Sequence, residues 1–182
     1  RIKNHISEYY FLVLLITIGA MLISTANDLI MLFVSIELVS IPAYILAGFE
    51  KSNPKSSEAS LKYFLLGVLA SAVMVYGFSL VFGLTKEINL YAISRIFNQR
   101  YVFMRNPLLI SGIAMSLVGF AFKIAAVPFH FWAPDTYEGS PTIVALIITS
   151  IVKVAAFAGF IRILYVGFGN YGTSKWIVLV IA

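Results

Sequence analysis

The 182-residue sequence contains no cysteine, only two histidines and few charged residues. Without cysteine these residues have no disulfide framework, thiolate zinc site or cysteine-ligated iron–sulfur cluster, so we expect no electron path through them. His5 and His130 are too few for a three-histidine metal site. Charged residues make up 12% of the sequence, and the net charge of +5 comes from lysines and arginines scattered between apolar stretches. This distribution is typical of membrane edges and argues against nucleic acid as a partner.

Apolar residues are far more abundant than a soluble domain of this length requires. They make up 60% of the sequence, and the mean hydropathy is +0.94. A typical soluble domain reaches about 45–50% only when glycine is counted. A bilayer core about 30 Å thick needs roughly 20 apolar helical residues, and stretches of that size recur along the chain. We predict an all-α, polytopic transmembrane bundle in one membrane domain, 1–182, with helices at about 9–26, 29–49, 54–84, 107–127 and 141–168.

The ends of the chain and its connectors add further expectations. The chain begins at Arg1 rather than at methionine, and a sixth apolar stretch runs from 176 to the last residue, 182, so we expect a piece of a longer membrane protein. Asn53-Pro54 has the form of a helix N-cap followed by an N1 proline. In the connector 85–106, apolar residues recur at helical spacing between polar ones, which predicts a short amphipathic helix on the membrane surface.

Glu37 is an ionisable residue inside an apolar stretch, eight residues after Leu29. A charge at mid-helix costs at least about 2.5–3.5 kcal/mol on membrane-insertion scales, so its presence calls for an explanation. Ser40 and Tyr44 follow at i+3 and i+7, which places three polar groups on one helical face. Glu37 is either hydrated near the interface or buried and titrating, and we favour burial.

Lys153 lies twelve residues after Pro141, close to the middle of its apolar stretch. Thr149 and Ser150 precede it by four and three residues, which predicts a polar stripe on an apolar helix. Arg162, near the end of the stretch, can extend to the interface, but Lys153 cannot easily do so. We interpret Lys153 as part of a proton or ion path rather than as a static structural pair.

Lys123 comes late in its stretch and is followed by Pro128, His130 and Pro134. Two prolines and a histidine beside a membrane lysine suggest a helix that breaks within the membrane or at its edge. Such breaks persist only where they are buried in protein or line water. The alternative is that Lys123 extends to the interface and Pro128 simply ends the helix.

Lys62 follows Glu58 by four residues, the favourable orientation for an ion pair along a helix. If the helix begins near Pro54, Lys62 lies about 12 Å along it and below the headgroups. With Glu37, Lys123, His130 and Lys153, it makes a set of titratable residues that suits proton relay better than hydrolysis. The aromatic residues are interpreted as facing the bilayer or its interfaces.

One segment carries a family resemblance. Residues 123–142, KIAAVPFHFWAPDTYEGSPT, resemble the signature of the antiporter-like membrane subunits of respiratory complex I, and the Pro-Asp-x-Tyr-Glu-Gly-x-Pro form is most like subunit N (subunit 2) of NADH–quinone oxidoreductases. The segments SIVKVAAF at 150–157 and EASLKYFLLG at 58–67 also fit this family.

The resemblance implies an inverted-repeat antiporter-like fold, of which this chain holds one five-helix repeat. It implies a discontinuous helix with a break near Pro128 and a short continuation to about 137. By the same resemblance Glu37 and Lys62 form an interacting pair on neighbouring helices, and Lys123 is the central lysine. His130 and Lys153 then carry protons onward.

The function implied by the resemblance is proton translocation within a proton-pumping NADH (or related donor):quinone oxidoreductase. We expect no cofactor in this chain; quinone, flavin and iron–sulfur clusters belong to partner subunits. Expected partners are other complex I membrane subunits and the lipid bilayer, in a bacterial plasma membrane or an organellar or thylakoid equivalent. Two alternatives stay open: a sodium/proton antiporter subunit of the Mrp type, and a scaffold subunit in which neutralising Lys153 changes assembly but not pumping.

Overall fold

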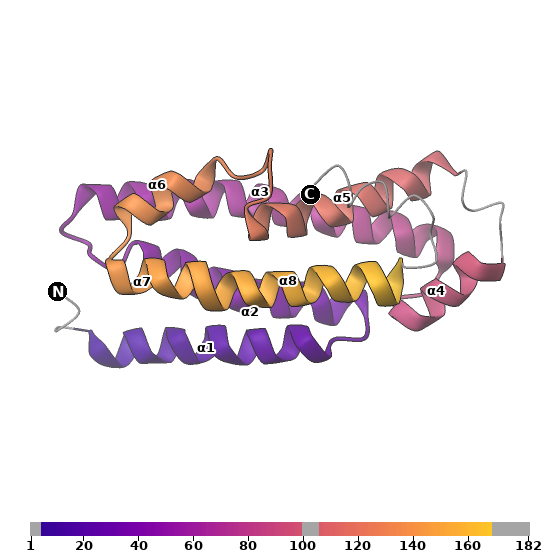
Figure 1. Cartoon of the computed structure of the whole chain (residues 1–182), viewed down its shortest axis with the longest axis horizontal. Helices are drawn as coiled ribbons and strands as arrows, with labels where there is room; N and C mark the ends of the chain where they lie inside the picture. The colour runs from indigo at the N-terminus through magenta and orange to yellow at the C-terminus, as the bar shows by residue number, and fades with distance from the viewer. Residues whose placement is uncertain (1–4, 100–105, 169–182) are drawn as a thin grey trace.

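The computed structural model describes residues 5–99 and 106–168, and within them the chain is helical almost throughout. The predicted apolar stretch at 176–182 lies outside the described residues. Figure 1 shows the long helices running side by side along the long axis of an elongated bundle. In chain order the elements are α1 (Ile6–Thr25), α2 (Leu29–Ala47), α3 (Pro54–Thr85), α4 (Leu90–Gln99), α5 (Pro107–Ile124), α6 (Trp132–Gly139), α7 (Thr142–Ile147), the π-helical turn η3 (Ile148–Val152), α8 (Lys153–Arg162) and the π-helical turn η4 (Ile163–Gly167).

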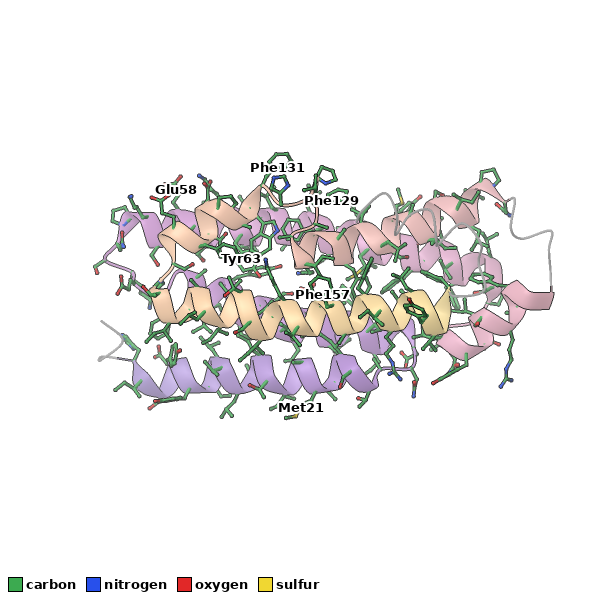
Figure 2. All side chains as sticks on the ribbon, viewed as in Figure 1. Met21, Glu58, Tyr63, Phe129, Phe131 and Phe157 are labelled. Carbon is green, nitrogen blue, oxygen red and sulfur yellow. The ribbon has the colours of Figure 1, made fainter. Side chains whose placement is uncertain are left out.

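Five of the helical segments are long and apolar enough to cross a membrane: α1, α2, α3, α5 and the continuous segment Thr142–Gly167. Their outer faces carry large apolar side chains, as at Phe11, Leu69 and Tyr165, which are 60%, 63% and 78% exposed. Figure 2 shows Met21 projecting from the outer face of α1. Because no soluble bundle leaves so much apolar surface in water, these faces suit lipid or further helices. The predicted all-α, polytopic membrane fold is confirmed.

Side-chain caps fix where several helices begin. Asn53 accepts a hydrogen bond from the Lys55 amide at 3.1 Å, and Pro54 occupies the first helical position, as the sequence predicts. Asp28 accepts from the Met31 amide at 2.7 Å at the start of α2. Each cap satisfies an amide that has no partner within its helix, so these helices start at defined residues.

The helix that carries Lys123 is broken, as predicted. Helix α5 ends at Ile124, Ala125 adopts a left-handed conformation with φ of 59°, and α6 begins only at Trp132. Pro128 lies in the turn between them, and Pro134 lies in the first turn of α6, where a missing amide hydrogen costs nothing. Figure 1 shows α6 following α5 along the same side of the bundle, over α3.

The helix that carries Lys123, α5, contacts the helices that carry Lys62 and Lys153, which are α3 and α8. Helix α3 packs along both α5 and α6, while α8 contacts α1 and α5. The π-helical turn η3 comes directly before Lys153, so the helix widens just before this lysine. Turns of this kind occur often at functional sites, but nothing in the local sequence predicts this one.

Candidate functional site

Lys123 is buried at the centre of the bundle and points at α2. Its side chain is 2% exposed, and its Nζ donates hydrogen bonds to Ser40 Oγ and to Tyr44 Oη, each at 2.7 Å. The Oε1 atom of Glu37 lies 3.8 Å from the same Nζ. The predicted polar face of α2 is therefore the surface that receives this lysine.

Glu37 is the acidic member of this group, and its other side opens outward. Its Oε1 accepts a hydrogen bond of 2.6 Å from Ser71 Oγ on α3, and its side chain is 19% exposed. It lines a groove of about 540 Å³ between α2 and α3, together with residues such as Phe33 and Tyr76. The carboxylate thus connects a buried cation on one side to an accessible groove on the other.

The expected pairing of Glu37 with Lys62 is wrong. Lys62 Nζ instead contacts Asp135 Oδ2 on α6 and Glu58 Oε1 on α3, both at 2.7 Å, and its side chain is 45% exposed. The α3 residue that reaches Glu37 is Ser71, nine positions after Lys62 and so about 13 Å farther along the helix. The predicted pair Glu58–Lys62 along α3 does form.

A stack of aromatic rings supports the hydroxyl of Tyr44. Tyr63 packs edge-on against Tyr44 with ring centroids 4.6 Å apart and lies parallel to Trp132 at 4.4 Å. Trp132 Nε1 donates to the Phe122 carbonyl at 2.9 Å, one residue before Lys123. Figure 2 shows Tyr63 inside the bundle.

The aromatic stack was missed by the sequence interpretation, which assigned the aromatic residues to the bilayer and its interfaces. Tyr44, Tyr63 and Trp132 are 3%, 1% and 1% exposed. The available signal was the position of Tyr44 on the same helical face as Glu37 and Ser40. Nothing comparable in the sequence marked Tyr63 or Trp132.

A glycine makes room for the Tyr44 hydroxyl. Gly67 on α3 faces Tyr44, and a methyl group at this position would overlap the hydroxyl oxygen. The close approach of α3 to α2 at this level therefore depends on the absence of a side chain.

Lys153 is half-buried at the start of α8. Its Nζ lies 5.4 Å from the centre of the Tyr137 ring, and among the described residues no carboxylate lies within ion-pair distance of it. The hydroxyls of Thr149 and Ser150 are exposed and donate to carbonyls of the preceding turn, so the predicted polar stripe is not directed at Lys153. The Tyr137 hydroxyl is buried and lacks a hydrogen-bond partner in the described part of the chain.

His130 lies in the turn between α5 and α6. Its ring stacks on Phe131 with centroids 4.9 Å apart, and its buried Nδ1 has no hydrogen-bond partner within residues 5–99 and 106–168. Figure 2 shows Phe129 and Phe131 at the tip of this turn. Of the five predicted site residues, only Glu37 and Lys123 are in direct contact. The described residues also bring no three histidine, aspartate or glutamate side chains together as a metal site.

Comparison with known proteins gives the family. The model of the "NADH:quinone oxidoreductase/Mrp antiporter, TM" family matches residues 26–182. NADH-quinone oxidoreductase subunit N of Chlorobium chlorochromatii is 48% identical over 167 residues, which are 90% of this chain and 31% of that protein. The chain thus spans about a third of the length of the curated relatives it matches.

Two solved structures share the fold. A chain of respiratory complex I from Thermus thermophilus has a TM-score of 0.74 and 40% identity, covering 85% of this chain and 34% of its own length. A chain of the Mrp complex from Dietzia sp. has a TM-score of 0.79 and 26% identity, covering 93% and 31%. With a family model that matches most of its residues, this chain belongs to the integral membrane family of NADH:quinone oxidoreductase and Mrp antiporter transmembrane subunits.

Proposed function

We propose that this chain is part of a proton-translocating membrane subunit of an NADH (or related donor):quinone oxidoreductase. The observation that carries the proposal is the Lys123–Glu37 group: a buried cation, two hydroxyls and one carboxylate inside a membrane-spanning bundle. Ionisable residues within membrane spans are costly and mark proton or ion paths. The high identity to subunit N relatives favours the redox-driven form of this activity.

The geometry suits a lysine that exchanges a proton in response to the charge on Glu37. At 3.8 Å, unit charges interact with an energy on the order of 4 kcal/mol when the effective dielectric constant is about 20. Protonating Glu37, or turning it toward the groove, removes that stabilisation of the Lys123 ammonium. Ser40 and Tyr44 hold the amine by accepting its hydrogen bonds. The Ser40 hydroxyl donates its own proton to the Ile36 carbonyl at 2.7 Å, which leaves Tyr44 as the hydroxyl that can pass a proton on.

Beyond Lys123, His130 and Lys153 are the proposed carriers toward the rest of the path. Lys153 has no acidic neighbour among the described residues to fix its charge, and His130 Nδ1 has no partner there. Neither nitrogen is therefore held by an ion pair or a hydrogen bond within the described residues. Lys62 lies outside the proposed path, because its ammonium is held between Asp135 and Glu58.

The proposal assigns the redox chemistry to other subunits. Quinone, flavin and iron–sulfur clusters then belong to partner subunits, and neighbouring complex I membrane subunits contact this one within the bilayer. Reduction of quinone elsewhere shifts the charge of Glu37 and Lys123 through successive electrostatic couplings.

The second candidate function is sodium/proton antiport of the Mrp type. The observation that favours it is the similarity in fold to a chain of an Mrp complex, with a TM-score of 0.79. The same buried lysine and carboxylate would then exchange protons for sodium ions without redox energy.

Sealed vesicles that hold the full-length protein in its complex separate these functions. We expect Lys123→Met to assemble normally and to lower quinone-linked substrate oxidation and dye-reported acidification together, by about tenfold or more, because a preorganised charged group is lost. Lys51→Met is the matched control, since Lys51 lies exposed in the turn before α3.

Two other results with Lys123→Met would contradict redox-driven proton translocation. Loss of sodium-driven proton exchange, with oxidation and acidification unchanged, would establish the antiporter function. Normal activity in every assay would mean that Lys123 has a structural role only and that the proposed function is wrong.

A further inference from the structure

The short helix α6 is held against α3 by ion pairs at one end of the bundle. Lys62 Nζ contacts Asp135 of α6 and Glu58 of its own helix at 2.7 Å each, and Lys55 Nζ lies 3.2 Å from Glu138 Oε1. These side chains surround a small pocket of about 160 Å³. We call the Glu58–Lys62–Asp135 triplet the α3–α6 lock.

The lock acts on two backbones that are already in close contact. A methyl group at Gly139 of α6 would come within 2.6 Å of Ala59 Cβ and 2.7 Å of the Lys55 carbonyl oxygen. An eight-residue helix is too short to be stable alone, so α6 depends on contacts of this kind for its position. Lys62 supplies the charged contact nearest to the first turn of α6.

From α6 a continuous series of contacts leads to Lys123. Trp132, the first residue of α6, lies parallel to the Tyr63 ring at 4.4 Å. Tyr63 packs on Tyr44 at 4.6 Å, and the Tyr44 oxygen accepts a hydrogen bond from Lys123 Nζ. A shift of α6 therefore moves the ring that supports one of the two hydroxyls on the central amine.

Trp132 also contacts the end of α5 directly. Its Nε1 donates to the carbonyl of Phe122, the residue before Lys123, at the point where the helix breaks. The position of α6 is thus transmitted both to the backbone that carries Lys123 and to the hydroxyl that receives it.

We propose that Lys62 is a positioning residue for Lys123: by holding Asp135 it fixes α6, and through Trp132 and Tyr63 it fixes the Tyr44 hydroxyl that accepts a hydrogen bond from the central amine. This inference rests on the proposed function, because it assigns the surroundings of the proton-carrying lysine. It differs from a role for Lys62 as a proton carrier, in which Asp135 would be dispensable.

The test changes two of the three lock residues, Lys62 and Asp135, in sealed vesicles containing the complete complex. We expect Lys62→Met and Asp135→Asn each to slow acidification by about tenfold, since misplacing a reacting group by about 1 Å costs up to roughly 100-fold. Both variants should shift the pH profile of acidification in the same direction, and the double variant should be no slower than either one. The reversed pair, Lys62→Asp with Asp135→Lys, should recover most of the rate, and Lys62→Arg should retain it.

Assembly is measured in parallel, and Lys51→Met removes an exposed lysine from the turn before α3 as the control. If Lys62→Met is slow while Asp135→Asn is normal, or if the reversed pair recovers nothing, Lys62 carries protons itself and the inference is wrong. An unchanged pH profile in slow variants would equally overturn it, because the lock would then affect only the amount of working complex.

Lys123→Met in the same vesicles separates this inference from the proposed function. If Lys123→Met abolishes acidification while the lock variants match the wild type, only the positioning role of Lys62 fails. If Lys123→Met pumps normally, the proposed function fails, and this inference fails with it.

Discussion

At the scale of single residues, the Glu37 carboxylate interacts with two groups by different means. It accepts a short hydrogen bond of 2.6 Å from Ser71, whereas the Lys123 ammonium lies 3.8 Å away. The second separation is too long for a hydrogen bond, so Glu37 acts on Lys123 through its charge. A substitution that keeps the hydrogen bond but removes the charge therefore isolates the electrostatic contribution.

Glu37→Gln is that substitution. The amide oxygen still accepts from Ser71, but the buried Lys123 ammonium loses its acidic neighbour, and we expect proton translocation in vesicles to fall about tenfold or more. Glu37→Asp keeps the charge and should retain most of the rate. Glu87→Gln, at an exposed site in the connector after α3, is the control. A Gln variant that pumps like the wild type would show that the charge on Glu37 is not used.

How far the sequence predicts this site depends on whether a partner lies on the same helix. The shared face of Glu37, Ser40 and Tyr44 follows from helical periodicity, and the structure confirms it as the surface that contacts Lys123. Spacing along α3 correctly predicts the Glu58–Lys62 pair. The pairing of Lys62 with Glu37, which the family resemblance implies, is wrong, because it depends on how far α2 and α3 are offset along their axes. Periodicity within one helix contains no information on that offset.

At the scale of the helices, local chemistry predicts where spans begin and break. Asn53-Pro54 starts α3, and the proline-rich segment after Lys123 interrupts the helix between α5 and α6. The two π-helical turns were not predicted, since their residues are as apolar as ordinary helical ones. The burial of Tyr63 and Trp132 was also missed, because an aromatic residue in an apolar sequence suits lipid and protein neighbours equally.

Helix α3 offers a matched pair of glycines for a test of close approach. Gly67 faces the Tyr44 hydroxyl so closely that a methyl group there would overlap it, whereas a methyl group at Gly83 would meet nothing within 4 Å. We expect Gly67→Ala to displace Tyr44 from Lys123 and to lower proton translocation severalfold. Overpacking of this kind costs about 1–3 kcal/mol.

Gly83→Ala should leave translocation unchanged and stabilise α3 by up to about 1 kcal/mol, the difference in helix propensity between the two residues. Both variants are assayed for acidification and for the amount of assembled complex. Equal rates of acidification in the Gly67 and Gly83 variants would contradict the close contact between Gly67 of α3 and Tyr44 of α2.

At the scale of the whole molecule, the connector between α1 and α2 joins three separate parts of the chain. The Asn27 carbonyl accepts a hydrogen bond of 2.9 Å from the amide of Leu90, the first residue of α4. The amide of Leu29, the first residue of α2, donates at 3.0 Å to the Ile88 carbonyl in the connector before α4. The Arg162 guanidinium at the end of α8 donates to the Ser24 carbonyl at 2.8 Å and also to the Ala26 and Thr25 carbonyls. These are carbonyls at the C-terminal end of α1 that lack helical partners, and a cation is favoured there.

Arg162 therefore links the last described span to the first, and its removal tests how the bundle is closed. We expect Arg162→Ala to leave several carbonyls of α1 without a donor and to cost about 1–3 kcal/mol of stability. Because large membrane complexes unfold irreversibly, the measurement is the half-life of the assembled complex at raised temperature. Arg95→Ala, an exposed arginine on α4, serves as the control and should leave the half-life unchanged. Lys153 lies on the same helix as Arg162, so proton translocation should fall in step with the loss of intact complex and not before it. A loss of translocation from complexes that remain fully assembled would instead place Arg162 among the residues that act on the proton path.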